Sequence, residues 1–284
     1  MKTEAHAPAQ YQFPYKLSNV ETVWSLENEL IEISGLSFCS SDSSIWAIND
    51  EKGLAYKLNS ENGKIVTRKK FASIGDYEGI ECIDDRLFVV KSNGDVYTLY
   101  NDDRNAEISK TELSSANDIE GLAYDKTTHS LILACKGSPA LRDHPKKKNR
   151  KATYAFDLKK NELGDKAYFE IHDSMLLNFI SNQNSLMGLG SSAIKKHKDR
   201  VKSFSPSAIA VHPYDDTYYI LSSVGKLLVV YDKESGLKHI EFLDKNIHYQ
   251  PEGICFNNEG NMLIANEGKG LIAKVHVFKM KERS

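Results

Sequence analysis

The sequence predicts an all-β fold, a β-propeller of five four-stranded blades. Three observations predict it. A short motif recurs at nearly constant spacing, the same order of apolar strands follows each copy, and the chain begins with the strand that its last unit lacks. Repeats of this kind are typical of propeller blades, and 284 residues suffice for one such domain.

The recurring motif is a polar residue, a glycine or alanine, and then Ile or Leu, at the start of an apolar run. Its five copies begin at Ser34, Glu78, Glu120, Ser207 and Glu252. Neighbouring copies are about 42 to 45 residues apart, except that the third interval is about twice as long. The long interval holds either one unit with a large insertion or two units, the second degenerate. We predict five blades, with six as the alternative.

Each motif opens the innermost strand of a blade. After a turn rich in Asp, Asn, Ser or Gly, a second apolar strand is expected at 44–50, 86–92, 131–137, 217–223 and 261–267. A third strand is expected at 53–58, 95–100, 151–158, 226–232 and 270–278. A more polar fourth strand is expected at 64–72, 106–113, 166–172 and 237–243.

The last unit ends near Phe278 after three strands, whereas the strand-like segment YKLSNVETVWSLE, 15–27, precedes the first motif. We expect this segment to complete the last blade, which closes the ring without an open sheet edge. Residues 15–284 then form a single domain. Residues 1–14 are predicted to be a disordered leader or the remnant of a tag.

Two segments do not fit the blade pattern and are predicted to be insertions, at about 138–151 and 174–206. We interpret the first, which is strongly basic, as a solvated loop; contact of residues 142–151 with phosphate or an anionic surface is the alternative. In the second, SMLLNFI predicts a short helix capped by Asp173 or Ser174. The remainder, including GLGSS, is expected to be a long flexible loop.

The cysteines show no paired metal-ligand spacing, and we predict that all four are free and buried: Cys39, Cys82, Cys135 and Cys255. His212 and His248 are expected to be surface side chains. No GxSxG, HExxH or phosphate-loop motif occurs. A net charge of −2 argues against a nucleic-acid partner, and no apolar run could span a membrane.

Because the first strand of each propeller blade lines the central channel, the five motif starts should converge on one channel mouth. Like charges brought together there need cations, protons or hydrogen bonds. Carboxylate oxygens favour Ca²⁺ or Mg²⁺ over zinc. The small residue after each start should permit close approach of the blades, and the Ile or Leu should point between them.

A second ring should form at the ends of the second strands, from Asp50, Lys91, Lys136, Ser223 and Glu267. Glu78–Lys91 and Glu120–Lys136 are candidate ion pairs, whereas blades one and five have acids in place of lysine. The predicted ligand-binding set is Ser34, Asp50, Glu78, Lys91, Glu120, Lys136, Ser207, Glu252 and Glu267. The predicted Ca²⁺ ligands are Glu78, Glu120, Glu252 and Glu267, with a purely structural role in capping strands as the alternative.

The repeated D-x-EG-[IL], the unit SPSAIAVHPYDDTYYILSS and the unit PEGICFNNEGNMLIANEG resemble the SdiA-regulated, or YjiK-like, family of bacterial β-propellers. The likeness covers the chain from about residue 16. It implies a protein of the cell envelope, periplasmic or membrane-anchored, whose precursor carries an export or lipid-anchor segment. The serines at Ser34 and Ser207 depart from a ring made entirely of acids.

The leading hypothesis is a non-catalytic envelope propeller that binds a small ligand or a protein partner at the channel mouth, together with Ca²⁺. The alternative is a metal-dependent hydrolase of lactonase or phosphoesterase type, in which the metal activates water. Further metal ligands in that case would come from Asn49, Asp50, Asn117 and Asn266. A structural scaffold for a partner protein is the third hypothesis.

Overall fold

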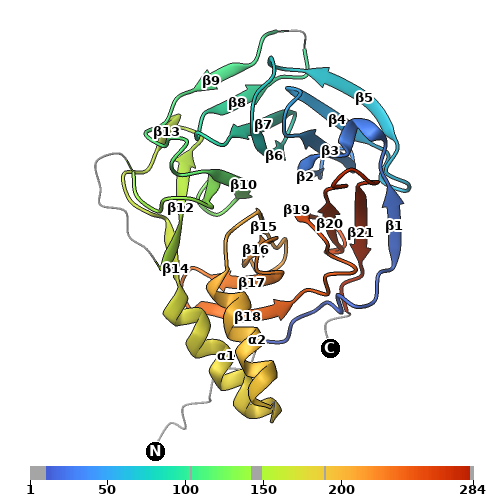
Figure 1. The fold of residues 1–284 in the computed structure, drawn as a ribbon. Helices are drawn as coiled ribbons and strands as arrows, with labels where there is room; N and C mark the ends of the chain where they lie inside the picture. Colours follow the sequence, from blue (N-terminus) through green and yellow to red (C-terminus); the bar gives the residue numbers. More distant parts are fainter. Residues whose placement is uncertain (1–10, 103, 142–148, 189, 282–284) are drawn as a thin grey trace, which may run out of the picture.

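The computed structural model describes residues 11–102, 104–141, 149–188 and 190–281. Five antiparallel sheets stand around a central axis like the blades of a propeller (Figure 1). The predicted all-β fold with five blades is therefore confirmed. Four sheets have four strands each, and the sheet of blade three has five because its outer edge is divided between two short strands.

The blades follow one another along the chain. Blade one contains β2 (Ile33–Cys39), β3 (Ser44–Asn49), β4 (Leu54–Leu58) and β5 (Ile65–Lys70). Blade two contains β6 (Tyr77–Ile83), β7 (Arg86–Lys91), β8 (Val96–Leu99) and β9 (Glu107–Ser109). Blade three contains β10 (Ile119–Asp125), β11 (Ser130–Cys135), β12 (Arg150–Asp157), β13 (Glu162–Leu163) and β14 (Phe169–His172).

Blade four contains β15 (Ala208–Val211), β16 (Tyr218–Ser222), β17 (Leu227–Asp232) and β18 (Gly236–Phe242). Blade five contains β19 (Pro251–Phe256), β20 (Met262–Asn266), β21 (Lys274–Phe278) and, from the other end of the chain, β1 (Thr22–Ser25). A short 3-10 helix, η1 (Asn28–Leu30), leads from β1 into blade one.

The ring closes as predicted, since β1 pairs antiparallel with β21 from Thr22 opposite Val277 to Ser25 opposite Lys274. Residues on the N-terminal side of the predicted domain boundary also pack against the blades. The Tyr11 and Tyr219 hydroxyls lie 2.7 Å apart, and the Phe13 ring stacks on His239 with centroids 4.4 Å apart. Residues 11–14 are thus part of the folded domain, because their aromatic rings cover the apolar space between blades four and five.

The core lies between the blades rather than along the axis. The second strands β11 and β16 are buried along their whole length, because apolar side chains on both faces pack against neighbouring blades. The outer strand β5, by contrast, is mostly exposed and rich in lysine and arginine. This gradient explains why the fourth strands are the most polar in sequence.

The insertion before blade four forms two helices, α1 (Asp173–Met187) and α2 (Ser191–Lys202), which project together from the rim (Figure 1). The expected helix after Asp173 is present and longer than predicted, but the expected loop at α2 is wrong. Val201 of α2 is fully buried in the core, and the His197 ring stacks on Phe242 at 3.9 Å. This packing stabilises α2, although its many lysines make the segment look like a polar loop in the sequence.

Residues 142–148 of the predicted basic loop lie outside the described residues, and Arg150 and Lys151 belong to β12. None of the helices in the described part of the chain is both long and apolar enough to cross a membrane.

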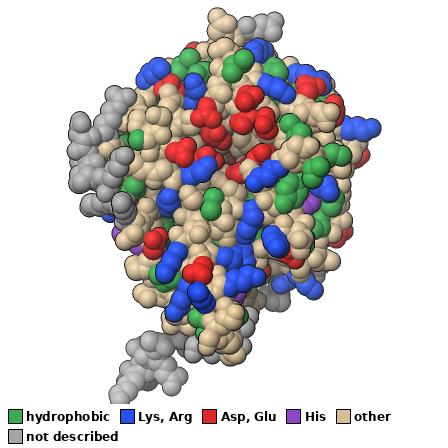
Figure 2. Space-filling model, viewed as in Figure 1, with side chains coloured by type: hydrophobic (Ala, Val, Ile, Leu, Met, Phe, Trp, Pro, Cys, Tyr) green, Lys and Arg blue, Asp and Glu red, His purple; other side chains and the backbone are tan. Residues whose placement is uncertain are grey.

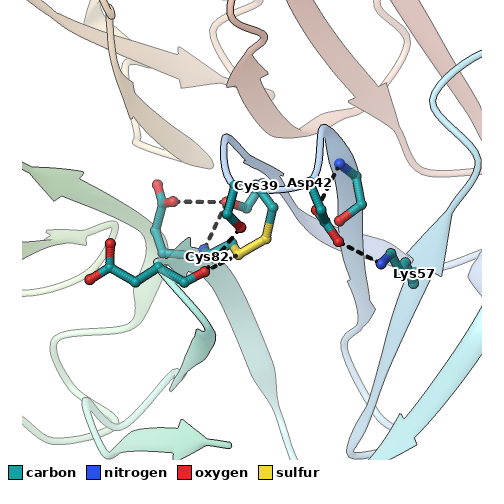
Figure 3. Close-up of a disulfide and its surroundings, with 9 residues drawn as sticks. Cys39, Asp42, Lys57 and Cys82 are labelled. Atoms are coloured by element: carbon teal, nitrogen blue, oxygen red, sulfur yellow. Dashed lines mark hydrogen bonds and ion pairs between the residues drawn. A yellow bond between two sulfur atoms is a disulfide. The ribbon is translucent and has the colours of Figure 1, made fainter. Parts of the chain in front are cut away.

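Cys39 at the end of β2 and Cys82 on β6 form a disulfide between blades one and two, with Cα atoms 5.2 Å apart (Figure 3). The prediction that these two cysteines are free is wrong. The residues are 43 positions apart in sequence, and only the side-by-side packing of two inner strands brings them together. Cys135 and Cys255 are free and buried, as predicted.

The two histidines expected at the surface are fully buried, so that prediction is wrong as well. His212 Nε2 lies 3.1 Å from the Tyr15 hydroxyl, and its Nδ1 lies 3.0 Å from Asp215. The His248 ring stacks on Phe278 with centroids 5.5 Å apart. The closing N-terminal segment covers the turn that carries His212, a contact that local sequence does not reveal.

We expect the double substitution Cys39→Ser/Cys82→Ser to lower the free energy of unfolding by about 2–4 kcal/mol, because the bond restricts a long loop in the unfolded chain. Urea unfolding of the oxidised protein measures the change. Reductant should reproduce the loss in the parent protein and leave the double variant unaffected. Four reactive thiols in the unfolded, unreduced protein would contradict the bond.

Candidate binding site at the channel mouth

The motif residues leave the regular strand ladder where the inner strands begin. The register shifts between Ile33 and Gly35, between Tyr77 and Gly79, and between Pro251 and Gly253. A similar shift surrounds Glu120 on β10. Each shift is a β-bulge, a device that turns a side chain away from its regular direction. In these four blades the bulges direct the first motif residue to the shared end of the inner strands, whereas β15 of blade four pairs with β16 in regular register.

The small motif residues allow the inner strands to meet at the axis. A Cβ added to Gly79 would lie 2.6 Å from Leu122 Cβ, and one added to Gly121 would lie 3.0 Å from the Ile209 nitrogen. The cavity left between them is about 10 Å³, room for roughly one water molecule. The mouth is therefore a cup with a closed floor, and the predicted reason for the motif glycines is confirmed.

Carboxylates surround this cup, and Figure 2 shows acidic side chains gathered around the centre of the ring. We name five of them the acid ring: Asp50, Glu78, Glu120, Glu252 and Glu267. The pKa of Asp50 is raised to about 6, mainly by burial and to a smaller extent by the charges of Glu32, Glu51 and Glu267. Burial and the charge of Glu120 raise the pKa of Glu252 to about 8.

The repulsion runs around the whole ring. Burial raises the pKa of Glu78 well above its usual range, and the charges of Glu120 and Asp50 raise it further. Glu267 acts on both Asp50 and Glu252, which completes the circle. Burial also raises the pKa of Glu120 and of Glu267. Each acid thus opposes the ionisation of its neighbours, as expected for like charges held close together away from water.

One of the two candidate ion pairs is formed. Lys136 Nζ lies 2.6 Å from Glu120 Oε1. Lys91 Nζ instead lies 5.9 Å from the centroid of the Tyr77 ring, and the described residues show no ion pair between Lys91 and Glu78. Elsewhere on the ring, the Gln250 side-chain amide donates to Glu267. The charge of Lys136 also opposes the rise in the pKa of Glu252, and the charge of Lys269 opposes that of Glu267, but the acids of the ring outnumber these lysines.

The two motif serines connect neighbouring blades. The Ser34 hydroxyl donates to the Tyr77 carbonyl at 2.6 Å, and the Ser207 hydroxyl donates to the Pro251 carbonyl at 2.7 Å. Both acceptors immediately precede a motif glutamate, and both serines are buried. Their part in ligand binding stays a prediction. The backbone nitrogen of Ser223 also donates to the Ser207 hydroxyl, at 3.1 Å.

Sequence reasoning missed a third set of side chains, two positions before each motif: Glu32, Asp76, Asp118, Ser205 and Gln250. The charges of Glu32 and Asp76 raise the pKa of ring acids, and Asp118 contributes to that of Glu120. The repeated D-x-EG pattern carried the signal. Its aspartate stands two residues before the glutamate in blades two and three.

A deeper carboxylate was missed as well. Glu81 on β6 is held by the Ser37 hydroxyl at 2.8 Å and by the Tyr124 backbone nitrogen at 3.2 Å. Burial raises its pKa to about 7. It lies next to the disulfide residue Cys82 in sequence, further along the inner strand than the acid ring.

The side chains around the cup do not converge on a single point. Within residues 11–102, 104–141, 149–188 and 190–281, no three His, Cys, Asp or Glu side chains are close enough together to hold one metal ion. Two of the three candidate amide ligands are engaged in local structure, and the third, Asn266, has its side-chain nitrogen 3.5 Å from His276 Nδ1. Asn49 Oδ1 accepts from two backbone nitrogens of its own turn, and the Asn117 amide donates to the Ser138 and Ala140 carbonyls.

Comparisons with known proteins address the fold and the family. The profile of a family described as SdiA-regulated matches residues 9–269. No curated protein matches the chain in sequence. Among solved structures, Myxococcus xanthus glutaminyl cyclase is 10% identical with a TM-score of 0.58, over 94% of this chain and 97% of that one. The PQQ-bound aldose sugar dehydrogenase of Streptomyces coelicolor is 9% identical with a TM-score of 0.51, over 91% and 97%. At such identities the likeness concerns the fold alone.

The closed floor predicts that Gly79→Ala destabilises the protein by about 1–3 kcal/mol, because the new methyl group would overlap Leu122. Thermal and urea unfolding measure the loss. Gly164→Ala is the matched control, since its Cβ would meet no atom nearer than 3.5 Å. Equal stability of the two variants would contradict the close approach.

The raised pKa of Glu252 predicts how stability changes with pH. The folded state binds the Glu252 proton more tightly than the unfolded chain does. The stability that protonated Glu252 contributes is therefore fully present below about pH 4.5 and is lost as pH rises through about 8. Glu252→Gln should therefore change stability little at pH 4. Above pH 8 it should stabilise the protein by on the order of 1–3 kcal/mol relative to the parent. Urea unfolding across this range measures it; a parallel offset at every pH would contradict the prediction.

Proposed function

The chain belongs to the SdiA-regulated family, and we propose that it is a non-catalytic propeller that binds a cationic ligand at the acid ring. The ligand would be a small organic amine or a lysine or arginine side chain of a protein partner. One observation carries the proposal: five mutually repelling carboxylates surround a closed cup with Lys136 as their counter-charge.

A cation is the occupant that this electrostatic arrangement favours most. Ionising the ring in isolation is unfavourable, and a bound positive charge reverses that by stabilising the carboxylates in their charged form. The closed floor means that a ligand enters and leaves by the same mouth. Since the acids surround the cup without converging, an extended organic cation suits them better than a bare ion, and hydrated Ca²⁺ is the second occupant we propose.

The disulfide supports placing the protein in the cell envelope. Stable disulfides form in oxidising compartments such as the bacterial periplasm and are rare in the cytosol. Cys39 and Cys82 are joined between two blades, whereas Cys135 and Cys255 are buried among apolar side chains where they stay reduced. A periplasmic or membrane-anchored location fits this pattern.

A metal-dependent hydrolase of lactonase or phosphoesterase type is the second candidate. The observation that favours it is the contrast between two neighbouring ring acids. Glu78 is held towards its protonated form by burial and by Glu120, whereas Glu120 is paired with Lys136. Two carboxyl groups with different proton affinities can serve as acid and base in one reaction.

We expect 1,4-diaminobutane, and more weakly Ca²⁺, to bind the protein with an affinity that rises at least about tenfold between pH 5.5 and pH 8.5. The reason is that the ring acids become available as anions over this range. Isothermal titration calorimetry of the full chain measures the affinity.

Glu78→Gln/Glu252→Gln should abolish this binding, whereas Glu61→Gln/Glu234→Gln, which removes two exposed acids outside the cup, should not. Absence of heat and of any melting-temperature shift with either cation would overturn the binding proposal. Turnover in a panel of lactones and phosphoesters, lost in the Glu78→Gln/Glu252→Gln protein, would decide for the hydrolase instead.

A further inference from the structure

A second concentration of charge, this one positive, lies on the same face as the acid ring. The chain as a whole has a net charge of −2, yet lysines and arginines gather around α2 at one edge of the face that carries the mouth (Figure 2). Helix α2 supplies most of them through the segment SSAIKKHKDRVK.

Helix α2 is fixed in place by its inner face, which leaves its lysines outside. The Arg200 guanidinium donates to the Gly225 carbonyl at 2.9 Å, to the Lys226 carbonyl and to the Leu243 carbonyl at 2.9 Å. Val201 is buried in the core beneath it. The lysines of the outer face are therefore presented on a rigid support rather than on a loop.

The same surface continues into two loops with exposed aliphatic tips. Val224 lines a groove against α2 and is 64% exposed. Lys226 Nζ donates to the Tyr249 carbonyl at 2.6 Å, and the Tyr249 hydroxyl donates to the Ile272 carbonyl at 2.9 Å. Leu271 and Ile272, beside this bond, are 76% and 51% exposed. These hydrogen bonds link α2, through the turn that carries Val224, to the β20–β21 loop, and the exposed residues along this path make up a patch.

We propose that this patch docks the protein onto an anionic lipid bilayer. We name it the α2 surface and define it by Lys195, Lys196, Lys202, Val224, Leu271 and Ile272. Lysines attract anionic headgroups, and neighbouring aliphatic side chains enter the boundary between headgroups and acyl chains. Basic residues alone would suit any polyanion, but the aliphatic tips on the same surface favour a lipid interface.

The acid ring determines the orientation of the protein on the bilayer. Its carboxylates on the same face are repelled by an anionic surface, so contact is made at the edge that carries α2 and the two loops. The mouth then stays open to a ligand near the headgroups. This inference does not depend on what the mouth binds, and no acid-ring residue is part of the lipid contact.

The experiment is co-sedimentation of the full chain with vesicles. We expect binding to vesicles of equal parts phosphatidylcholine and phosphatidylglycerol, no binding to pure phosphatidylcholine, and release as salt is raised. Lys195→Glu/Lys196→Glu should weaken binding at least about tenfold. Leu271→Ser/Ile272→Ser should weaken vesicle binding by the same factor at low and high salt, because salt screens charges but does not weaken the insertion of apolar side chains.

Lys64→Glu/Lys159→Glu is the matched control with the same change in net charge, at exposed turns away from α2, and should bind like the parent. Glu78→Gln/Glu252→Gln should bind vesicles at least as well as the parent, because it removes only acids that the membrane repels, and this separates the proposal from ligand binding at the mouth. If the folded protein does not bind anionic vesicles, the proposal is wrong, and an acidic protein becomes the preferred partner of the α2 surface. Equal losses in the patch and control variants overturn it too, since they would reflect net charge alone.

Discussion

The close approach of five inner strands at the propeller axis is the constraint on which the rest of this structure depends. The strands can meet there because the second motif residue is an alanine in blade four and a glycine in the other four blades. In blade two, for example, the Cα of Gly79 leaves no room for a methyl group beside Leu122. This approach closes the channel floor and places the polar motif residues of all blades at one mouth.

The electrostatics of the mouth follow from that geometry. Strands that meet at an axis bring their first side chains together, and three of those side chains are glutamates. Asp50 and Glu267, from the ends of second strands, add to them, so burial and mutual repulsion act on every member of the acid ring. The same crowding that builds the ring also makes its ionised form unfavourable, and a bound cation would offset this cost.

Bonds between neighbouring blades add to the packing at the axis in holding the ring together. The Ser34 and Ser207 hydroxyls reach carbonyls of the next blade, and the Cys39–Cys82 disulfide joins blades one and two. At the rim, pairing of β1 with β21 closes the circle. Because this closure is complete, the α1–α2 insertion can project from the edge and carry a concentration of positive charge without disturbing the mouth.

The repeat spacing, the strand order, the strand that closes the ring and the five members of the acid ring can be predicted from the sequence, because each follows from the place of a residue or strand within the repeat. The tertiary structure alone decided which side chains meet across blades. It joined Cys39 to Cys82, buried His212 under the N-terminal segment, and paired Lys136 but not Lys91 with a ring acid. It also converted a lysine-rich segment into a packed helix. A repeat fixes where a residue lies within its own blade, whereas these contacts depend on how neighbouring blades and insertions pack in three dimensions.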